Sequence, residues 1–387
     1  MRLLIAGGGT GGHIYPALAV ARSLRDPSRS DGDVPELTWL GGHRGLERTL
    51  VRAAGIPMQR LALRSLRTVD RDVHLVLDPA RLAISVPQAT AILARERPAA
   101  IFTTGGYVAI PTLMAATALR IPVVLWEGNV VPGKSVRVTA RMASVLAVSY
   151  EPTCTALAGA GRPCYVTGTP IRDTREIDRE AARARLDVPP AARLMLIFGG
   201  SQAVRRFNAA VAAALPQLIE RVYVIHVTGD DGYAAALAAR EALPEDLRSR
   251  YRPYPFLRDE MLSALAASDL VVGRAGSSTL AEVTALGLPM VVVPYPHAAG
   301  HQRANARILA DAGAARLVED EAFDAAALLD AAAILDDPKA HVTMSAAARG
   351  LGRPAAAAAV ADLVLALARR KPLPDPGLVE RRSRGAG

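Results

Sequence analysis

Cysteine, lysine and aromatic residues are scarce in this chain, and each scarcity narrows the kinds of protein it can be. The only cysteines, Cys154 and Cys164, are too few for a zinc ribbon or a disulfide framework. Aromatic residues make up 4% of the sequence and no nucleic-acid recognition motif occurs, which argues against a nucleic-acid-binding protein. Lysine occurs at positions 134, 339 and 371 alone, which indicates a compositional bias of the source.

Long apolar runs are also missing. No uncharged apolar run reaches the roughly 18 residues of a membrane-spanning helix, and the sequence opens directly on a strand-like segment, so we expect no secretory signal. With 51% hydrophobic and 21% charged residues, the chain should fold, and 387 residues favour two domains. These features predict a cytosolic protein without a spanning segment.

Positive charge is concentrated in the first half. The chain carries a formal net charge of +9, and residues 1–168 hold 19 basic against 11 acidic side chains. Such a bias favours an anionic partner, either a phosphorylated substrate or an anionic lipid surface. Nucleic acid is the weaker explanation, for the reasons above.

The opening residues are the most informative. The apolar segment 2–6 leads into six residues of which five are glycine (7–12), then His13, then a periodic stretch, 14–25, typical of a helix. Glycine lets backbone N–H groups approach an anion, and the following helix points its positive end at it. Gly7, Gly9 and Gly12 also match a dinucleotide motif, but the second strand, 36–40, ends on glycines without the acidic residue that a ribose needs. An NAD or flavin site is therefore disfavoured.

Strand and helix patterns alternate twice along the chain, which predicts an α/β fold with two doubly wound parallel sheets. Strands are expected near 2–6, 36–40, 99–103, 122–126 and 144–148, with helices at 45–54 and 110–119, and then near 193–198, 222–227, 270–272, 290–293 and 315–318. We expect an N-terminal domain, 1–168, completed by a helix near 354–370, and a C-terminal domain, 169–350. The Pro-, Gly- and Arg-rich tail, 371–387, is expected to be disordered.

Ligands of such sheets bind at the carboxyl ends of the strands. The loops predicted there are rich in glycine and polar residues: 103–107, 126–129, 199–202, 273–279 with Glu282 behind it, and 294–305. A loop of small residues that opens a helix, with an acid about a turn and a half later, suits a nucleoside diphosphate. The helix start takes the phosphates and the acid takes the ribose hydroxyls.

Together these loops resemble the MurG family of peptidoglycan N-acetylglucosaminyltransferases over about residues 2–370. The matching motifs occur in order: GGGTGGH (7–13), GGY (105–107), EGNVVPG (127–133), GTPIR (168–172), GGSQ (199–202) and RAG (274–276) followed by Glu282, Gln302 and Asn305. The resemblance implies a GT-B fold, in which two Rossmann-like domains face each other across a cleft. It further implies inverting transfer of GlcNAc from UDP-GlcNAc to the C4 hydroxyl of MurNAc-pentapeptide on undecaprenyl pyrophosphate, without metal or cofactor.

The resemblance also assigns residues. The UDP-GlcNAc site is expected to include Thr10, Gly11, Gly12, His13, Asn129, Arg172, Ser201, Leu257, Ser277, Glu282, Gln302 and Asn305. The pyrophosphate of the lipid acceptor is expected at Gly8, Gly9, Thr10, Gly105, Gly106 and Tyr107. Four positions depart from the family pattern, Trp126, Gly128, Thr169 and Ala203, and leave room for a related enzyme with another acceptor.

Inverting transfer needs a base that takes the proton of the acceptor hydroxyl. His13 is the first candidate, since an imidazole titrates near neutrality, and Glu127 is the second. The alternatives are that His13 only orients phosphates and that Glu127 is a structural carboxylate that fixes the loops. The sequence leaves both pairs open.

A lipid acceptor requires a membrane-facing surface on the N-terminal domain. Two basic sets are candidates: Arg60, Arg64, Arg67 and Arg71 before the apolar stretch 73–86, and Lys134, Arg137 and Arg141. Basic residues beside apolar ones suit peripheral binding to the cytoplasmic face of the membrane; alternatively, the apolar stretch is core and the arginines are simply solvated. Other functions also remain: another GT-B transferase, a UDP-GlcNAc 2-epimerase, a nucleotide-sugar sensor or a dinucleotide oxidoreductase.

Overall fold

The computed structural model describes residues 1–29, 33–42, 47–63, 74–175, 177–200, 205–257, 260–298 and 300–385, without the side chains of 74–80 and 82. The chain forms two compact units, one of Met1–Arg172 with Arg353–Gly387 and one of Asp173–Gly352. The first unit is therefore discontinuous: the chain leaves it at Arg172 and re-enters it at Arg353. The expected division lay at residue 168, four residues earlier.

Unit 1 is built on a parallel sheet of seven described strands in the order β3-β2-β1-β4-β5-β6-β7. The strands are β1 (Arg2–Ala6), β2 (Glu36–Gly41), β3 (Met58–Arg60), β4 (Ala100–Thr103), β5 (Val123–Glu127), β6 (Val145–Val148) and β7 (Cys164–Val166). Its helices are α1 (Gly11–Leu24), α2 (Glu47–Ala53), α3 (His74–Glu96), α4 (Ala109–Ala118), α5 (Lys134–Thr139), α6 (Glu151–Leu157), α15 (Ala356–Ala368) and α16 (Pro376–Ser383), with 3-10 turns η1 (Pro27–Arg29), η2 (Ala140–Met142) and η3 (Ala158–Ala160).

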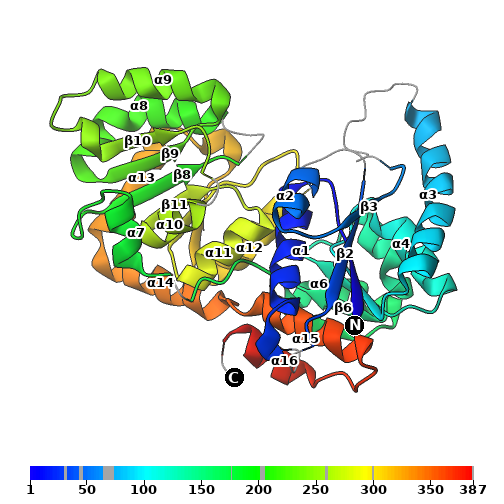
Figure 1. Ribbon diagram of the computed structural model, residues 1–387. Helices are drawn as coiled ribbons and strands as arrows, with labels where there is room; N and C mark the ends of the chain where they lie inside the picture. The colour runs from blue at the N-terminus through cyan, green and yellow to red at the C-terminus, as the bar shows by residue number, and fades with distance from the viewer. Residues whose placement is uncertain are drawn as a thin grey trace. The chain divides into compact units, whose positions relative to one another are not determined.

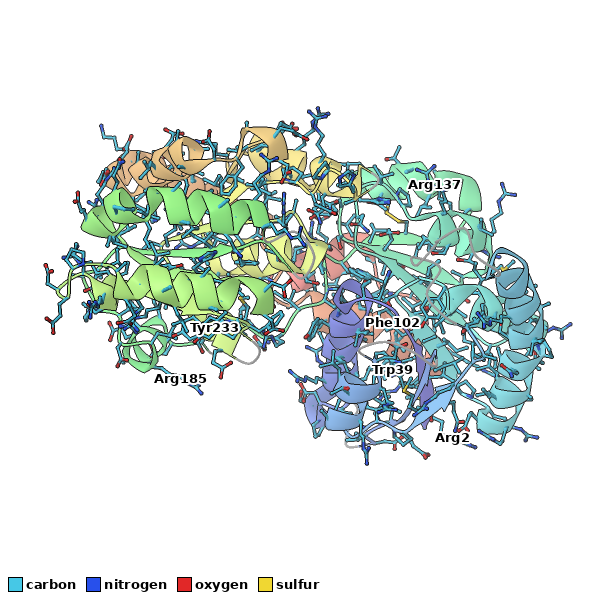
Figure 2. The ribbon with its side chains drawn as sticks, turned by 90° about the horizontal axis from the view of Figure 1, so that it is seen from above. Arg2, Trp39, Phe102, Arg137, Arg185 and Tyr233 are labelled. Carbon is cyan, nitrogen blue, oxygen red and sulfur yellow. A yellow bond between two sulfur atoms is a disulfide. The ribbon has the colours of Figure 1, made fainter. Side chains whose placement is uncertain are left out.

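Both faces of this sheet are covered, as the near-continuous apolar strands require. Leu3 and Ile5 of β1 belong to a core with α1 and α15, whereas Leu4 belongs to a core with α3, α4 and α5. Figure 1 shows the orange-red α15 beside the blue α1, although more than 300 residues separate them in the chain. In Figure 2, Trp39 and Phe102 lie inside this unit, while Arg2 and Arg137 lie at its rim.

Unit 2 repeats the design with a parallel sheet in the order β10-β9-β8-β11-β12-β13. Its elements are α7 (Arg179–Arg185), β8 (Leu194–Phe198), α8 (Arg205–Arg221), β9 (Tyr223–Val227), α9 (Asp230–Glu241), η4 (Arg248–Arg250), β10 (Tyr251–Tyr254), α10 (Glu260–Ala267), β11 (Leu270–Gly273), α11 (Ser277–Leu286), β12 (Met290–Val292), α12 (His301–Asp311), β13 (Ala315–Leu317), η5 (Asp320–Ala322), α13 (Ala325–Ala333), η6 (Ile334–Asp336) and α14 (Pro338–Leu351). Leu194 and Leu196 face the helices α10, α11 and α12, and Met195 and Ile197 face α8 and α13.

The expected disorder of the tail is wrong for its described part. Residues 376–383 form α16, which starts with an Asp375 side-chain cap on the Leu378 N–H. Val379 is 2% exposed in the core of unit 1, and Glu380 pairs with Arg353 at 2.7 Å. Tyr165 on β7 donates to the Pro374 carbonyl. A cap, an apolar contact and an ion pair together outweigh the helix-breaking composition that suggested disorder.

Cys154 and Cys164 form a disulfide with their Cα atoms 5.8 Å apart. A single disulfide is not a framework, but the sequence analysis did not predict that α6 and β7 would bring the two cysteines together.

One described stretch, Pro338–Ala368, is long and apolar enough to cross a membrane by length and composition, and half of its most apolar window is buried. It is two helices, α14 and α15, separated by residues 352–355. Ala348 of α14 packs into unit 2, and Val360 and Val364 of α15 pack into unit 1. Each helix is thus a core helix of its own unit.

Candidate active site

The carboxyl edge of the unit 1 sheet brings the two predicted glycine loops together. Gly9, Gly105 and Gly106 have φ angles of +100°, +79° and +74°, which disfavour any side chain. A Cβ placed on Gly106 would lie 3.6 Å from the Gly8 carbonyl oxygen and 3.7 Å from Nε2 of His13. The loop after β1 and the loop after β4 therefore contact each other beside the His13 imidazole.

His13 lies in the first turn of α1 and is half-buried. Its Nδ1 atom is 2.7 Å from the Thr104 carbonyl oxygen, and the Thr104 hydroxyl donates to the His13 carbonyl at 3.1 Å. Because a carbonyl oxygen can only accept, Nδ1 is the protonated nitrogen in this contact. The lone pair of the neutral ring is then on Nε2, the nitrogen that lies beside Gly106. The fold thus selects the tautomer that a general base requires.

Glu47 is a site residue that the sequence did not reveal. Its side chain is 1% exposed, and it accepts hydrogen bonds from the Gly9 N–H at 3.4 Å and the Tyr107 hydroxyl at 3.1 Å. Burial, and then the Glu47 carboxylate, raise the pKa of the Tyr107 phenol above its usual value. The phenol therefore keeps its proton at neutral pH and acts as a donor. The only sequence signal was an acid in the first turn of a helix that follows the second strand.

Glu127, the second candidate base, ends β5 and is 6% exposed. Its carboxylate accepts three hydrogen bonds, from the Asn129 N–H at 2.9 Å, the Asn129 side-chain amide at 2.9 Å and the Gly133 N–H at 2.8 Å. Both carboxylate oxygens of Glu127 are therefore occupied by N–H donors of its own loop. This geometry favours the alternative in which Glu127 fixes the loop 127–133.

Two of the departures from the family pattern have structural partners. Trp126 is 1% exposed in the core of unit 1, and its indole N–H donates to the Gly168 carbonyl at 3.1 Å. Thr169 shares a 2.7 Å hydrogen bond with Ser149. Both substitutions tie β5 or β6 to the segment 168–169. Ala203 lies outside the described residues, and nothing in the structure explains Gly128.

In unit 2, the predicted donor residues gather on loops at the carboxyl edge of the sheet. Ser277 and Glu282 are half-buried in α11, whose N-cap is Gly276. The buried Ser278 hydroxyl oxygen has no hydrogen-bond partner among the described residues. Leu257 follows β10 and packs against the core, and Ser201 lies outside the described residues. The start of α11 therefore holds an unsatisfied hydroxyl where a phosphate is expected.

Gln302 and Asn305, expected at the sugar, also order these loops. The Gln302 side-chain oxygen accepts from the Tyr295 N–H at 2.9 Å. Asn305 is 0% exposed, and its amide nitrogen lies 3.5 Å from the Ala275 carbonyl. The first turns of α12 are thus bound to the loops after β11 and β12.

Arg274 is the second site residue whose role the sequence did not reveal. Its buried guanidinium donates to the Val293 and Pro294 carbonyls at 3.3 Å, forms an ion pair with Asp320 and lies 4.8 Å from the Phe207 ring centroid. Tyr295 is a second ring partner, at 5.5 Å. Arg274 therefore links the loops after β11 and β12 to α8 and η5.

The predicted residues thus divide between the units. Those in unit 1 are Gly8, Gly9, Thr10, Gly11, Gly12, His13, Gly105, Gly106, Tyr107, Glu127, Asn129 and Arg172, and those described in unit 2 are Leu257, Ser277, Glu282, Gln302 and Asn305. Within the described ranges, no group of three or more His, Cys, Asp or Glu side chains is arranged to hold a metal ion.

A surface cavity of about 600 Å³ on unit 1 contains one of the predicted basic residues, Arg60, together with Arg48 and Arg52 of α2. Arg64, Arg67 and Arg71 lie outside the described residues.

The second predicted basic set lies on α5 and η2: Lys134, Arg137 and Arg141 are exposed, as are Val138 at 66% and Met142 at 36%. Ile84 of α3 is 53% exposed and Met114 of α4 is 42% exposed. Basic and apolar side chains are therefore mixed on neighbouring helices.

Comparison with known proteins agrees with these features. Residues 3–148 match the N-terminal domain of glycosyltransferase family 28, and residues 194–362 match its C-terminal domain. The UDP-N-acetylglucosamine–N-acetylmuramyl-(pentapeptide) pyrophosphoryl-undecaprenol N-acetylglucosamine transferase of Gloeobacter violaceus is 39% identical and covers 94% of this chain and 97% of the relative. The enzyme of the same name from Frankia casuarinae is 39% identical with 94% of each covered.

Solved structures give the same result. The crystal structure of Acinetobacter baumannii MurG matches with a TM-score of 0.72 at 27% identity, over 94% of this chain and 99% of that one. A putative UDP-N-acetylglucosamine 2-epimerase from Listeria monocytogenes matches with a TM-score of 0.69 at 15% identity, over 97% and 98%, which shows a shared fold only. The two-domain α/β glycosyltransferase fold is therefore confirmed, and the chain belongs to the MurG family of N-acetylglucosamine transferases within glycosyltransferase family 28.

Proposed function

We propose that this enzyme transfers GlcNAc from UDP-GlcNAc to the C4 hydroxyl of MurNAc in the pentapeptide-bearing undecaprenyl pyrophosphate lipid, with inversion at the anomeric carbon. The observation that carries the proposal is the near-full-length likeness to transferases named for that donor and acceptor. The loops at the carboxyl edges of both sheets support it, because they supply the groups that such a reaction needs.

The reaction is a single displacement. The acceptor oxygen forms a bond to the anomeric carbon as the bond from that carbon to the UDP oxygen breaks, and the hydroxyl proton passes to a base. We assign the base to Nε2 of His13, because the Nδ1 contact with Thr104 leaves the lone pair of the neutral ring on Nε2. Glu127 then acts through the loop 127–133, whose N–H groups it binds.

The leaving diphosphate needs donors rather than a base. In unit 2 we assign this task to the start of α11, with Ser277 and the unsatisfied hydroxyl of Ser278. Glu282 would accept from the ribose hydroxyls, Leu257 would line the nucleoside pocket, and Gln302 and Asn305 would hold the sugar. Ser201 and Arg172 complete the proposed donor set, with Thr10, Gly11, Gly12 and Asn129 from unit 1.

The acceptor pyrophosphate is assigned to the paired glycine loops of unit 1. Gly8 lies against Gly106, and the loops that hold Gly8, Gly9, Thr10, Gly105 and Gly106 place little side-chain bulk in the way of an anion. In the structure the Gly9 N–H donates to Glu47 and the Gly105 N–H to the Thr103 hydroxyl. Tyr107, held protonated beside Glu47, adds a phenol to the same loops. Acceptor binding therefore falls to the more basic part of the chain.

We further propose that unit 1 binds peripherally to the anionic cytoplasmic face of the plasma membrane, where the lipid acceptor is found. Exposed Ile84 on α3 and Met114 on α4 support this assignment, as does α5, where Val138 is exposed together with Lys134 and Arg137. Each basic residue near an anionic surface contributes about 1 kcal/mol of binding free energy, and salt screens that term.

We expect the full chain to sediment with anionic vesicles at low salt and to be released as salt increases. The variant Val138→Asp combined with Arg137→Glu should bind at least tenfold more weakly, since it removes an apolar contact and reverses a charge. Vesicle binding that is absent, or insensitive to salt, would contradict the assignment.

The reaction itself is tested by incubating the chain with UDP-GlcNAc and a short-chain analogue of the lipid acceptor. We expect acceptor-dependent release of UDP and a product whose NMR spectrum shows a β linkage to O4. An analogue without the C4 hydroxyl is the matched control and should release no UDP. UDP-ManNAc formed from the donor alone would instead establish an epimerase, and transfer to the 4-deoxy analogue would refute the C4 assignment.

A further inference from the structure

The disulfide between Cys154 and Cys164 joins α6 to the first residue of β7, an edge strand of the unit 1 sheet. Both cysteines are half-buried and pack against a core of unit 1, so neither residue is sealed from solvent. They are the only cysteines of the chain, and therefore no competing disulfide can form within it. The pair thus has a defined oxidised state and a defined reduced state.

β7 does not depend on this bond for its place. Its backbone pairs with β6 from Cys164 to Val166, and the Tyr165 hydroxyl donates to the Pro374 carbonyl near α16. The helix α6 has only seven residues, and it carries the other sulfur. Reduction should therefore act chiefly on α6, because the strand is held by other contacts.

The residue next to Cys154 connects α6 to the candidate active site. Thr153 is 0% exposed, and its hydroxyl lies 3.0 Å from the Asn129 carbonyl and 3.2 Å from the Val130 carbonyl. Those carbonyls belong to the loop 127–133, which Glu127 organises through Asn129 and Gly133. A movement of Cys154 is thus passed to the active-site loop through one residue.

Two reduced sulfur atoms cannot remain at bonding distance and must separate to van der Waals contact. Because Cys164 lies in the sheet and α6 is a single short helix, the part of this separation that side-chain rotation does not absorb displaces α6 and with it the Thr153 hydroxyl. The loop then loses the donor that holds two of its carbonyls. The oxidised pair is therefore the state in which the loop 127–133 is held.

We propose that Cys154 and Cys164 form a reversible redox modification site that controls acceptor turnover, with the oxidised enzyme the more active. In the forward step, one cysteine thiolate attacks a low-molecular-weight disulfide such as glutathione disulfide and releases one glutathione thiolate. The second cysteine thiolate then attacks the mixed disulfide and releases the other. The protein loses two electrons and two protons, and one glutathione disulfide becomes two glutathione molecules. The activity change rests on the proposed function; the redox chemistry and the loop movement do not.

The test equilibrates the full chain in buffers of graded glutathione to glutathione disulfide ratio. In each buffer, alkylation followed by mass spectrometry measures the disulfide fraction, and hydrogen exchange measures protection of the amides in 127–133. Acceptor-dependent UDP release is measured in parallel. We expect loop protection and acceptor kcat/KM to fall together as the disulfide fraction falls, with one midpoint, and kcat/KM to fall roughly fivefold, as for the loss of one hydrogen bond.

Two variants and one internal control sharpen the test. C154S/C164S should resemble the reduced enzyme in every buffer. T153V should form the disulfide with the same midpoint while loop protection no longer follows it. The affinity for UDP without its sugar should not change with redox state, because the groups that we assign to the nucleoside and to the start of α11, namely Leu257, Ser277, Ser278 and Glu282, all lie in unit 2.

Three results would overturn the proposal: no disulfide at any ratio, a disulfide without a change in loop protection, or an equal loss of UDP affinity. If the loop responds but no acceptor-dependent UDP release occurs in any buffer, the redox site stands as a loop switch and the proposed function fails.

Discussion

Substitution can test the roles of the two ring nitrogens of His13 separately. Nδ1 donates to the Thr104 carbonyl at 2.7 Å, and Nε2 lies toward Gly106. Asparagine at position 13 would place an N–H donor near the Nδ1 position and nothing at Nε2. Glutamine would place an amide near the Nε2 position but could not serve Thr104 with the same atom. The pair His13→Asn and His13→Gln therefore separates positioning from proton transfer.

If Nε2 is the base, both variants lose the proton acceptor and kcat should fall about 10²–10⁴-fold, which corresponds to about 2.7–5.5 kcal/mol of barrier. The KM for the acceptor should stay within about threefold in His13→Asn, because the helix start and the Thr104 contact persist. In His13→Gln the folded state should also lose about 1 kcal/mol, the net value of one hydrogen bond.

The assay is acceptor-dependent UDP release at saturating donor, combined with thermal unfolding of each variant. If Nε2 only donates a hydrogen bond to a phosphate, the amide of glutamine replaces it and kcat of His13→Gln should remain within about tenfold of the wild type. That result would refute the assignment of His13 as the base. If His13→Asn loses kcat and also loses more thermal stability than His13→Gln, that result would count against the assignment of His13 as the base too.

Two further predictions concern unit 2. Arg274→Met removes a buried cation from the Val293 and Pro294 carbonyls and from Asp320, which keeps its second partner Arg206 at 3.3 Å. We expect the free energy of unfolding to fall by about 3 kcal/mol, which lowers the Tm by about 6–12 °C. Calorimetry should also show weaker UDP binding. A Tm within about 2 °C of the wild type would contradict the role of Arg274. Burial lowers the pKa of His226 to about 3, so between pH 6.5 and 5 the unfolded chain gains a proton that the folded chain does not. The unfolding free energy should fall toward lower pH with a slope that grows from about 0.7 kcal/mol per pH unit at pH 6.5 to about 1.3 kcal/mol per pH unit at pH 5. Urea unfolding of His226→Gln should show a slope that is smaller by this amount, and an unchanged slope would refute the prediction.

The sequence predicted the parts of the fold that local pattern determines. Long apolar strands such as 2–6 and 193–198 were found in place, because a strand buried on both faces has few polar residues. Three strands were missed, β3, β7 and β10, and each takes its conformation from a neighbouring strand. The similarly short β12 and β13 were predicted, because they lie in the mostly apolar segments 290–293 and 315–318. Local pattern is therefore informative where a strand is mostly apolar, and β3 (MQR) and β10 (YRPY) are not.

The residues of the candidate site also divide into those that local sequence pattern predicted and those that it missed. The glycine loops and His13 were predicted because their chemistry is contiguous in sequence. Glu47 was missed because its partner Tyr107 lies 60 residues away. The role of Arg274 was missed because its partners lie on several elements. Contacts of this kind depend on the order of the strands in the sheet, which cannot be derived from a single sequence.

The discontinuity of unit 1 has a consequence for how the protein is made. The core between α1 and the sheet is completed by Val360 and Val364 of α15, and the chain reaches α15 only after all of unit 2. At about 5–20 residues per second, the ribosome delivers α15 roughly 10–40 s after Arg172. During that interval unit 2 is synthesised in full, while the part of this core that Val360 and Val364 fill stays open. The half of the enzyme that begins synthesis first is thus the half that finishes folding last, and chaperones that bind nascent chains should meet it there.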